Sequence, residues 1–189
     1  MKGIILYKGK YGATRQYADW LGADLQLPVV MADHLEGVDL SKYDFLVIGS
    51  SVYIGKLQLR DWLKRSIGSF QGKKLFLFIV CGTPPGQKDI LDYIARHNIP
   101  EGIRGQSNVF FLQGRVIRKD LSWMDRMALN FAAGFAKDPA EKNRMKNGYD
   151  EVRKENLVPI RNAILSFISG QGLSKREKDS KSLKTMPDF

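Results

Sequence analysis

Residues 9–14, GKYGAT, directly follow an apolar run and have the composition of an anion-binding loop. Their two glycines allow a ligand to approach free backbone N–H groups at the start of a helix, and the Thr14 hydroxyl can donate another hydrogen bond. A plain strand-to-helix turn capped by Thr14 would use the same residues, so both interpretations stay open. The loop has neither a Walker motif nor the G-x-G-x-x-G dinucleotide fingerprint. Lys8 stands where a phosphoacceptor receiver domain would need acidic residues.

Two further loops of small residues, 49–55 (GSSVYIG) and 81–86 (CGTPPG), also follow apolar runs. Tyr53 is an aromatic candidate for stacking on a flat ring, and the second loop suits close backbone approach. Cys81 is better explained as a small packing residue than as a nucleophile, because no histidine lies near it in the sequence. The three loops together predict a phosphate cradle and two walls for a planar heterocycle. No side chain is expected to act as a catalytic acid or base.

The elements that must position these loops alternate between strand and helix. Continuously apolar runs predict strands at residues 3–7, 44–49, 74–81 and 108–112, with a weaker strand at 28–31. Helical patterns fall between them at residues 13–25, 57–67 and 87–97. This alternation predicts a parallel, doubly wound α/β sheet, in which a ligand binds beyond the carboxyl ends of the strands. The three loops occupy those positions.

A long stretch after the last of these strands, residues 114–149, interrupts the alternation. It contains an apolar helical pattern, followed by a polar segment; the pattern consists of Trp123, Met127, Leu129, Phe131 and Phe135. A last amphipathic helix is expected over residues 151–169, with a kink at Pro159. We therefore expect a single domain over residues 1–169 with an insertion at about 114–149, and a charged, disordered tail over residues 170–189.

The composition is that of a globular protein with a strong positive charge. The 189 residues carry 30 Lys and Arg against 20 Asp and Glu, a formal net charge of +10, which favours anionic partners. Nucleic acid is the weaker expectation among them, because the basic residues are spread along the chain rather than interleaved with aromatics on one element. One cysteine and two histidines predict neither a disulfide framework nor a metal site. With no apolar run near the roughly 18 residues of a membrane span, the chain is expected to be cytoplasmic.

The three loops and the order of elements resemble the flavodoxin family, which binds flavin mononucleotide (FMN) at this edge of the sheet. The matching residues are 11–14 (YGAT), where the family usually has T-G-x-T, and the turn 47–51 (VIGSS). The resemblance covers almost the whole chain and implies five parallel strands in the order 2-1-3-4-5, with FMN as the cofactor. A single phosphate cradle and the lack of a second nucleotide fingerprint favour FMN over a dinucleotide.

The resemblance also assigns the expected cofactor contacts to the three loops. These residues are Gly9, Lys10, Tyr11, Gly12, Ala13, Thr14, Ser50, Ser51, Val52, Tyr53, Ile54, Gly55, Cys81, Gly82, Thr83 and Pro84. One departure from the family is that Lys8, Gly9 and Lys10 replace the hydroxyl residues that usually open the phosphate loop. The two lysines could hold the phosphate dianion instead.

The chain is also similar to the bacterial menaquinone-dependent protoporphyrinogen dehydrogenases, flavodoxin-like enzymes with a long insertion near the fifth strand. The similar residues are 12–15 (G-x-T-R), 43–44 (YD) before 47–49, and 123–127 (WMDRM) in the insertion. This similarity implies oxidation of a protoporphyrinogen-like substrate with a quinone acceptor. Arg115 and Arg118 are candidate clamps for a substrate carboxylate. The 123–127 motif could equally anchor the inserted helix to the domain.

Three functions remain open: this FMN-dependent enzyme, an electron-transfer flavodoxin without its own substrate, and an interaction module that has lost the cofactor. Mobile carriers of this fold are characteristically acidic, so the positive charge favours the enzyme. The expected partners are a quinone, a porphyrin-like anionic substrate, a redox protein or the inner face of an anionic membrane. The insertion helix could lie on that membrane, cover the substrate or pack on its own domain.

Overall fold

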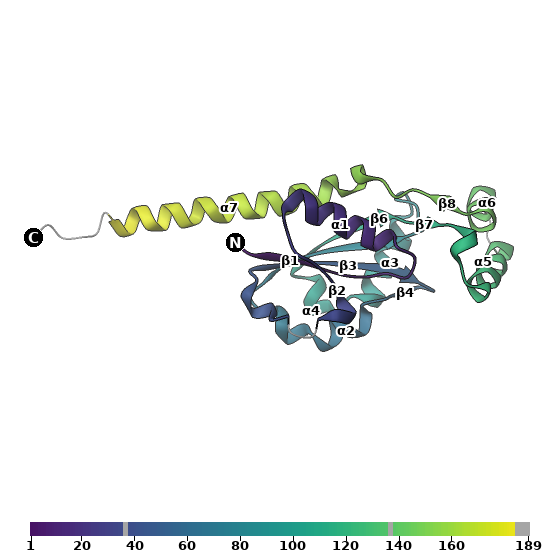
Figure 1. The fold of residues 1–189 in the computed structure, drawn as a ribbon, viewed down its shortest axis with the longest axis horizontal. Coiled ribbons are helices and arrows are strands. Elements are labelled where there is room, and N and C mark those ends of the chain that lie inside the picture. The colour runs from purple at the N-terminus through teal and green to yellow at the C-terminus, as the bar shows by residue number, and fades with distance from the viewer. Residues whose placement is uncertain (36–37, 136–137, 184–189) are drawn as a thin grey trace, which may run out of the picture.

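A sheet of mostly parallel strands forms the centre of the computed structural model, which describes residues 1–35, 38–135 and 138–183 (Figure 1). Its parallel strands are β1 (Gly3–Lys8), β2 (Val29–Met31), β3 (Phe45–Tyr53), β5 (Lys74–Cys81) and β6 (Ser107–Gln113). They pair in the order β2-β1-β3-β5-β6. The strand order and the doubly wound α/β fold expected from the sequence are confirmed.

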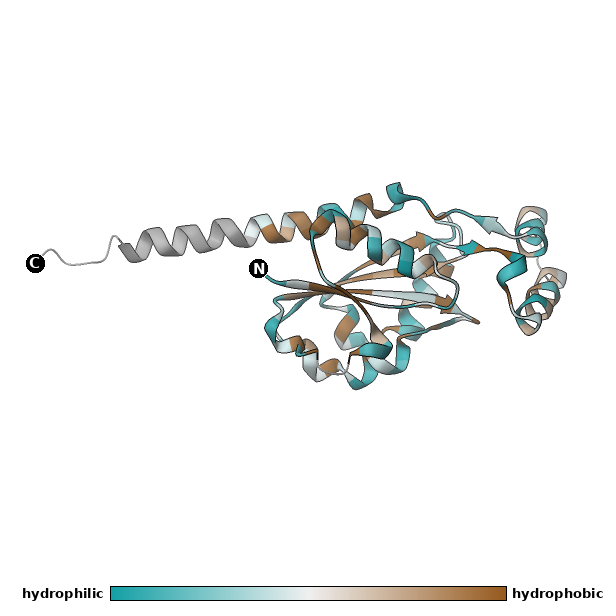
Figure 2. Ribbon diagram, viewed as in Figure 1, coloured by the Kyte–Doolittle hydropathy of each residue, from teal (hydrophilic) through white to brown (hydrophobic). Residues whose placement is uncertain are grey.

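Helices cover both faces of the sheet, which explains why the strands are apolar without alternation. One face is covered by α1 (Ala13–Leu25) and the first part of α7 (Val158–Leu183), and the other by α2 (Arg60–Arg65), α3 (Lys88–Asn98) and α4 (Glu101–Arg104). Ile5 packs in one core cluster with Tyr17 of α1, whereas its neighbour Ile4 packs in the other with Leu63 of α2. The hydrophobic colouring of the central strands in Figure 2 shows this buried layer.

Residues 57–67, predicted as one helix, form a short strand and a shorter helix instead. Strand β4 (Lys56–Leu57) pairs antiparallel with the end of β3, and α2 begins only at Arg60. The prediction was wrong because Leu57, Leu59 and Leu63 are all buried, and a strand followed by a helix satisfies that pattern as well as one helix does. The Leu57 N–H donates to Asn98 Oδ1 at 3.0 Å, which holds β4 against α3.

Helix α7 differs from the last predicted helix at both ends. A 3₁₀ turn covers Lys154–Leu157 and the α-helix begins at Val158, so Pro159 lies in the first turn rather than inside the helix. The missing N–H of a proline is tolerated there. The helix continues to Leu183, past residue 169 where the sequence predicts a disordered tail to begin, because good helix formers such as Lys, Arg and Glu follow. Residues 184–189 of that tail lie outside the described residues.

The insertion after β6 forms a small helical unit on a two-stranded base. Strands β7 (Arg115–Val116) and β8 (Tyr149–Asp150) pair antiparallel at its base. Between them lie a 3₁₀ turn (Arg118–Asp120), α5 (Trp123–Phe135) and α6 (Pro139–Asn147). The helices α5 and α6 pack together at the end of the molecule opposite to the one from which α7 projects (Figure 1). Further 3₁₀ turns span Ala32–His34, Leu40–Lys42 and Ile67–Phe70.

No helix in the described part of the chain is both long enough and apolar enough to cross a membrane.

Candidate cofactor site

A cavity of about 370 Å³ lies where the carboxyl ends of β1, β3 and β5 meet the insertion. The three loops of the sheet form one side of its lining, and β7, α5 and β8 form the other. Among the residues singled out from the sequence, those that line the cavity are Lys10, Tyr11, Ala13, Thr14, Ser51, Val52, Tyr53, Ile54, Cys81, Gly82 and Arg115. The fold thus brings three loops that are far apart in the sequence to one cavity.

Other residues singled out from the sequence lie outside this lining: Gly9, Gly12, Ser50, Gly55, Thr83, Pro84 and Arg118. The Ser50 hydroxyl accepts a hydrogen bond from the Leu59 N–H at 3.1 Å, so it holds the chain after β4. Arg118 donates to the Met145 carbonyl at 2.9 Å and to Asn130 Oδ1 at 3.0 Å, and therefore stabilises the insertion internally.

Two hydroxyl groups beside the cavity are buried without a hydrogen-bond partner. Thr14 is 1% exposed, and neither its Oγ1 nor Ser51 Oγ bonds to any of the described residues. Both lie around Gly9, where an added Cβ would stand 2.5 Å from Thr14 Oγ1 and 3.6 Å from Ser51 Oγ. Buried hydroxyls normally find partners, because leaving them unpaired costs free energy. A ligand with acceptor oxygens at this position would satisfy both.

The two glycines of the 9–14 loop have different reasons to be glycine. Gly12 is the N-cap of α1 with φ of 79°, a left-handed conformation, and its carbonyl accepts the Gln16 N–H at 3.0 Å. Helix α1 has no side-chain cap, so Thr14 does not have the capping role that a plain turn would give it. Gly9 is needed because the side chain of Thr14 occupies the space where a Cβ would be. The arrangement favours the anion-binding interpretation of this loop.

A carboxylate from the insertion reaches two of the three loops, 9–14 and 49–55. Asp125 is 6% exposed and accepts hydrogen bonds from Lys10 Nζ at 2.8 Å, from the Tyr53 hydroxyl at 2.5 Å and from the Tyr11 hydroxyl. The bond to Asp125, and after it the contact with Tyr53, raises the pKa of Lys10 above its ordinary value. Lys10 Nζ also lies 3.9 Å from the centre of the Tyr53 ring, a cation–π contact. This network holds α5 against the cavity.

The turn between β3 and β4 places a strained residue at the cavity. Ile54 and Gly55 have φ of 47° and 71°, the signs expected of a two-residue type I′ hairpin turn. A left-handed conformation costs a residue with a Cβ about 1–2 kcal/mol, and Ile54 is also 73% exposed. Such strain is often kept where a residue contacts a ligand.

The 81–86 loop is tied to the strand that leads into the insertion. The Gly114 N–H donates to the Cys81 carbonyl at 2.9 Å, and Gln113 Nε2 donates to the Thr83 carbonyl at 2.9 Å. Burial raises the pKa of the Cys81 thiol, which leaves it a poor thiolate nucleophile. Within the described ranges, no group of three or more His, Cys, Asp or Glu side chains could hold a metal ion.

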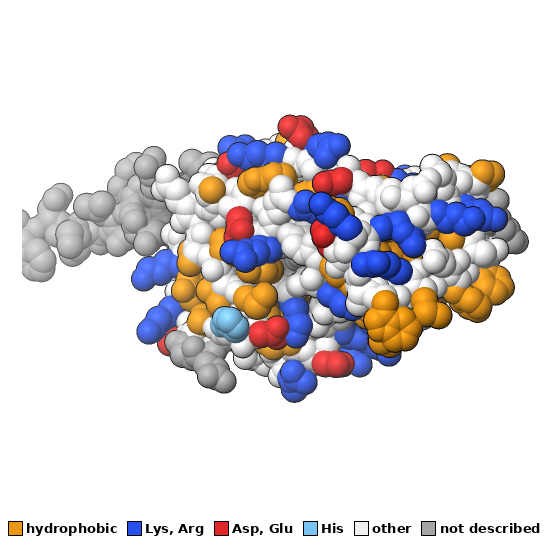
Figure 3. Space-filling model, turned by 45° about the vertical axis from the view of Figure 1, so that its right-hand side comes forward, with side chains coloured by type: hydrophobic (Ala, Val, Ile, Leu, Met, Phe, Trp, Pro, Cys, Tyr) orange, Lys and Arg blue, Asp and Glu red, His pale blue; other side chains and the backbone are white. Residues whose placement is uncertain are grey.

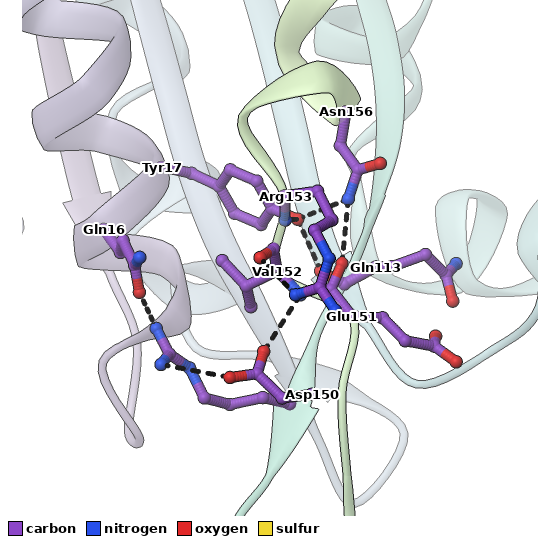
Figure 4. Close-up of polar contacts among 9 residues, drawn as sticks. Gln16, Tyr17, Gln113, Asp150, Glu151, Val152, Arg153 and Asn156 are labelled. Atoms are coloured by element: carbon purple, nitrogen blue, oxygen red, sulfur yellow. Dashed lines mark hydrogen bonds and ion pairs between the residues drawn. The ribbon is translucent and has the colours of Figure 1, made fainter.

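The base of the insertion is bound to the domain by polar contacts, shown in Figure 4. Arg115 donates to Gln16 of α1, and its Nη1 lies 3.6 Å from Asp150 Oδ2 of β8. The Tyr17 hydroxyl, also on α1, donates at 2.8 Å to the carbonyl of Gln113, which directly precedes the insertion, and accepts a hydrogen bond from Asn156 Nδ2 at 2.7 Å, just before α7. Arg115 therefore lines the cavity with its charge already paired.

Several lining residues were not singled out from the sequence as cofactor contacts: Val80, Gly114, Val116, Leu121, Asp125, Ala128, Leu129, Ala132 and Tyr149. Four of them, at positions 125, 128, 129 and 132, lie on α5 at helical spacing, so the sequence did contain a pattern that indicates this side of the helix. It was obscured by the stronger stripe of Trp123, Met127, Phe131 and Phe135, which is exposed to solvent. The 123–127 motif does anchor its helix, through Asp125 rather than through Trp123.

Several solved structures of flavodoxin-like proteins are similar to this chain at low sequence identity. A flavodoxin from the domain Archaea is 19% identical, with 64% of this chain and 88% of that chain covered and a TM-score of 0.41. A flavoprotein in complex with FMN from Lactobacillus acidophilus NCFM is 16% identical, with 59% and 91% covered and a TM-score of 0.42. A WrbA-like flavodoxin from Agrobacterium tumefaciens is 15% identical, with 59% and 83% covered and a TM-score of 0.39. No curated protein sequence matches the chain significantly.

The family model described as a flavodoxin domain matches residues 4–143. The matched segment contains nearly all of the parallel sheet, the three loops of the cavity and most of the insertion. Because this match covers well over half of the chain and the sheet has the expected strand order, the chain belongs to the flavodoxin domain family.

Proposed function

We propose that this protein binds FMN in the cavity and uses it for redox chemistry. The observation that carries the proposal is the pair of buried hydroxyls, Thr14 and Ser51, that lack partners among the described residues beside the 9–14 loop. A phosphate offers acceptor oxygens to both hydroxyls and to the backbone N–H groups at the N-terminus of α1. Family membership supports the same cofactor. When bound, FMN supplies one- and two-electron transfer.

The protein's own residues would hold the two ends of FMN differently. The 9–14 loop and Ser51 would bind the phosphate, and Tyr53, Ile54 and the 81–82 backbone would contact the ring. The lysine pair expected at the phosphate is otherwise engaged, because Lys8 Nζ lies 2.6 Å from Asp33 and Lys10 is paired with Asp125. The phosphate would therefore depend on backbone and hydroxyl donors.

The insertion favours an enzyme over a mobile carrier. Helix α5 lays Asp125, Ala128 and Leu129 along the cavity, whereas a carrier must expose its flavin to a protein partner. In finer detail, we propose a protoporphyrinogen-like reductant and a quinone oxidant, which the similarity of residues 123–127 supports. An electron-transfer flavodoxin without its own substrate is the less favoured alternative.

The cofactor proposal is tested by titrating the purified protein with FMN and with riboflavin, which lacks the phosphate, and following the visible absorbance of bound flavin. Thr14→Val removes the hydroxyl at nearly constant volume. It should weaken FMN binding by about 1.5–3 kcal/mol, the range for a hydrogen bond to a charged group, and leave riboflavin binding almost unchanged. Thr14→Ser keeps a hydroxyl and should bind FMN nearly as the parent does. No binding of micromolar FMN by the parent would remove the proposal, and equal weakening of both flavins would place the phosphate elsewhere.

The substrate proposal is tested with the FMN-loaded protein under anaerobic conditions. Oxidation of protoporphyrinogen beyond the amount that the bound FMN itself can accept should require a menaquinone analogue as the acceptor. A protein that binds FMN tightly but does not accelerate this reaction would be assigned to the carrier alternative.

A further inference from the structure

We propose that the outward side of α5 binds the surface of an anionic lipid bilayer. Five large apolar side chains on this helix are between 61% and 72% exposed: Trp123, Met124, Met127, Phe131 and Phe135. Trp123, Met127 and Phe131 are spaced four residues apart, so they stand above one another on one side of the helix. We call these five residues the outer face.

The domain does not need the outer face for its own packing. The opposite side of α5 buries Asp125 and Ala133 and contributes Ala128 to the cavity. A helix that serves only its own domain is apolar on one side and polar on the other, whereas α5 is apolar on both. Phe131 and Phe135 contact each other with ring centres 4.9 Å apart, yet each remains 72% exposed. The outer face therefore has the character of a surface that binds a partner.

The insertion that carries the outer face also carries exposed positive charge. Figure 3 shows hydrophobic side chains gathered at the end of the molecule that carries the insertion, with Lys and Arg side chains beside them. The exposed cations of the insertion include Lys119, Arg126 on α5, and Lys142 and Lys146 on the adjacent helix α6. Exposed Asp120 and Asp138 offset only part of this charge. The partner is therefore expected to be anionic.

An anionic bilayer fits these features better than other occupants do. A second copy of the chain would bring the same cations against one another, which opposes association. Tryptophan, phenylalanine and methionine on one side of a helix suit the boundary between head groups and acyl chains, while flanking Lys and Arg contact anionic head groups. Helix α5 lies at the end of the molecule (Figure 1), and its five outer side chains are more than half exposed, so a flat surface can reach them. Lipid binding of this kind does not depend on the proposed cofactor.

The test is cosedimentation of the full chain with vesicles of phosphatidylglycerol and phosphatidylcholine, compared with vesicles of phosphatidylcholine alone. We expect binding to the anionic vesicles that weakens with added salt. The triple variant Trp123→Ser/Met127→Ser/Phe131→Ser should lose binding by at least about tenfold, because the apolar area inserted into the bilayer is lost. The double variant Lys142→Glu/Lys146→Glu should also bind more weakly, at low salt above all.

A matched control carries substitutions of exposed apolar residues elsewhere. Ile90 and Tyr93 on α3 are 48% and 59% exposed, so Ile90→Ser/Tyr93→Ser should bind vesicles as the parent does. Unchanged binding of the triple variant, or equal loss in the control, would overturn the proposal. The proposal would also be overturned if the parent chain did not bind vesicles but formed a dimer, and if the triple variant were a monomer. The outer face would then join two copies of the chain. Any of these failures leaves FMN binding, measured separately, unaffected.

Discussion

At the scale of single residues, Tyr53 combines two roles that a pair of substitutions can separate. Its hydroxyl donates to Asp125 at 2.5 Å, while its ring lines the cavity. Tyr53→Ala should weaken FMN binding by about 1–2 kcal/mol, because stacking and buried apolar area are lost. Tyr53→Phe keeps the ring, so its affinity for FMN should be close to that of the parent and higher than that of Tyr53→Ala. Flavin titration of both variants is the measurement, and equal weakening by Phe and Ala would assign the effect to the hydroxyl.

The strained backbone of Ile54 predicts a variant that gains stability and loses cofactor affinity. Asn tolerates the left-handed conformation and is favoured in type I′ turns, so Ile54→Asn should stabilise the fold by about 1 kcal/mol. The same change removes an apolar side chain from the cavity and should weaken FMN binding. Gln26, with φ of 53° at the end of α1, is a control, because Gln26→Asn relieves a similar conformation away from the cavity. Thermal unfolding and flavin titration should show that only Ile54→Asn changes FMN affinity.

Residue types and spacing predicted which loops gather at the cavity, but not how their side chains are paired. Lys8 and Lys10 were expected at a phosphate, yet their carboxylate partners, Asp33 and Asp125, lie 25 and 115 positions away in the sequence. Pairing over such separations is set by the fold and not by local pattern. The same holds for Thr14, whose hydroxyl could be placed near a ligand, although its burial without a partner is visible only in the structure.

At the scale of elements, the most accurate predictions came from segments whose apolar residues follow one pattern, helical or continuous, and stop at a recognisable loop. Helix α1 and strand β5 have the predicted bounds, because a helical or continuously apolar pattern ends at a loop on either side. Residues 57–67 failed because their apolar spacing fits two structures. Helix α5 was found, but periodicity alone does not say which side of a doubly apolar helix faces the domain: Asp125, Ala128 and Leu129 line the cavity, whereas the stripe that stands out in the sequence is exposed.

The attachment of α5 predicts a local effect of Asp125. Asp125→Asn keeps the shape of the side chain but removes the negative charge that Lys10 contacts at 2.8 Å. We expect faster amide hydrogen exchange throughout α5, with exchange in the central sheet unchanged, because the helix would open more often without unfolding the domain. Asp120→Asn, an exposed carboxylate in the same insertion, is the control and should leave exchange unaltered. If amide exchange in α5 were equally slow in Asp125→Asn and Asp120→Asn, the apolar inner side of α5 alone would hold the helix on the domain.

At the scale of the whole molecule, the structure divides into a flavodoxin core and an insertion whose two ends meet. Val116 and Tyr149 are cross-strand partners in β7 and β8, so the chain leaves and returns at the same place. The core clusters that cover the sheet are formed by residues outside the insertion. A shortened chain should therefore fold, whether the insertion serves a substrate, a membrane or both.

This division can be tested by replacing residues 117–148 with Asn-Gly, the dipeptide that best closes a two-residue hairpin between paired strands. The shortened protein should unfold cooperatively at a temperature close to that of the parent, because both helix-covered faces of the sheet remain. It should still bind FMN through the 9–14 loop, although cofactor exchange should be faster without α5 over the cavity. Binding to anionic vesicles should be lost entirely. A shortened chain that cannot fold would instead show that the insertion completes the core.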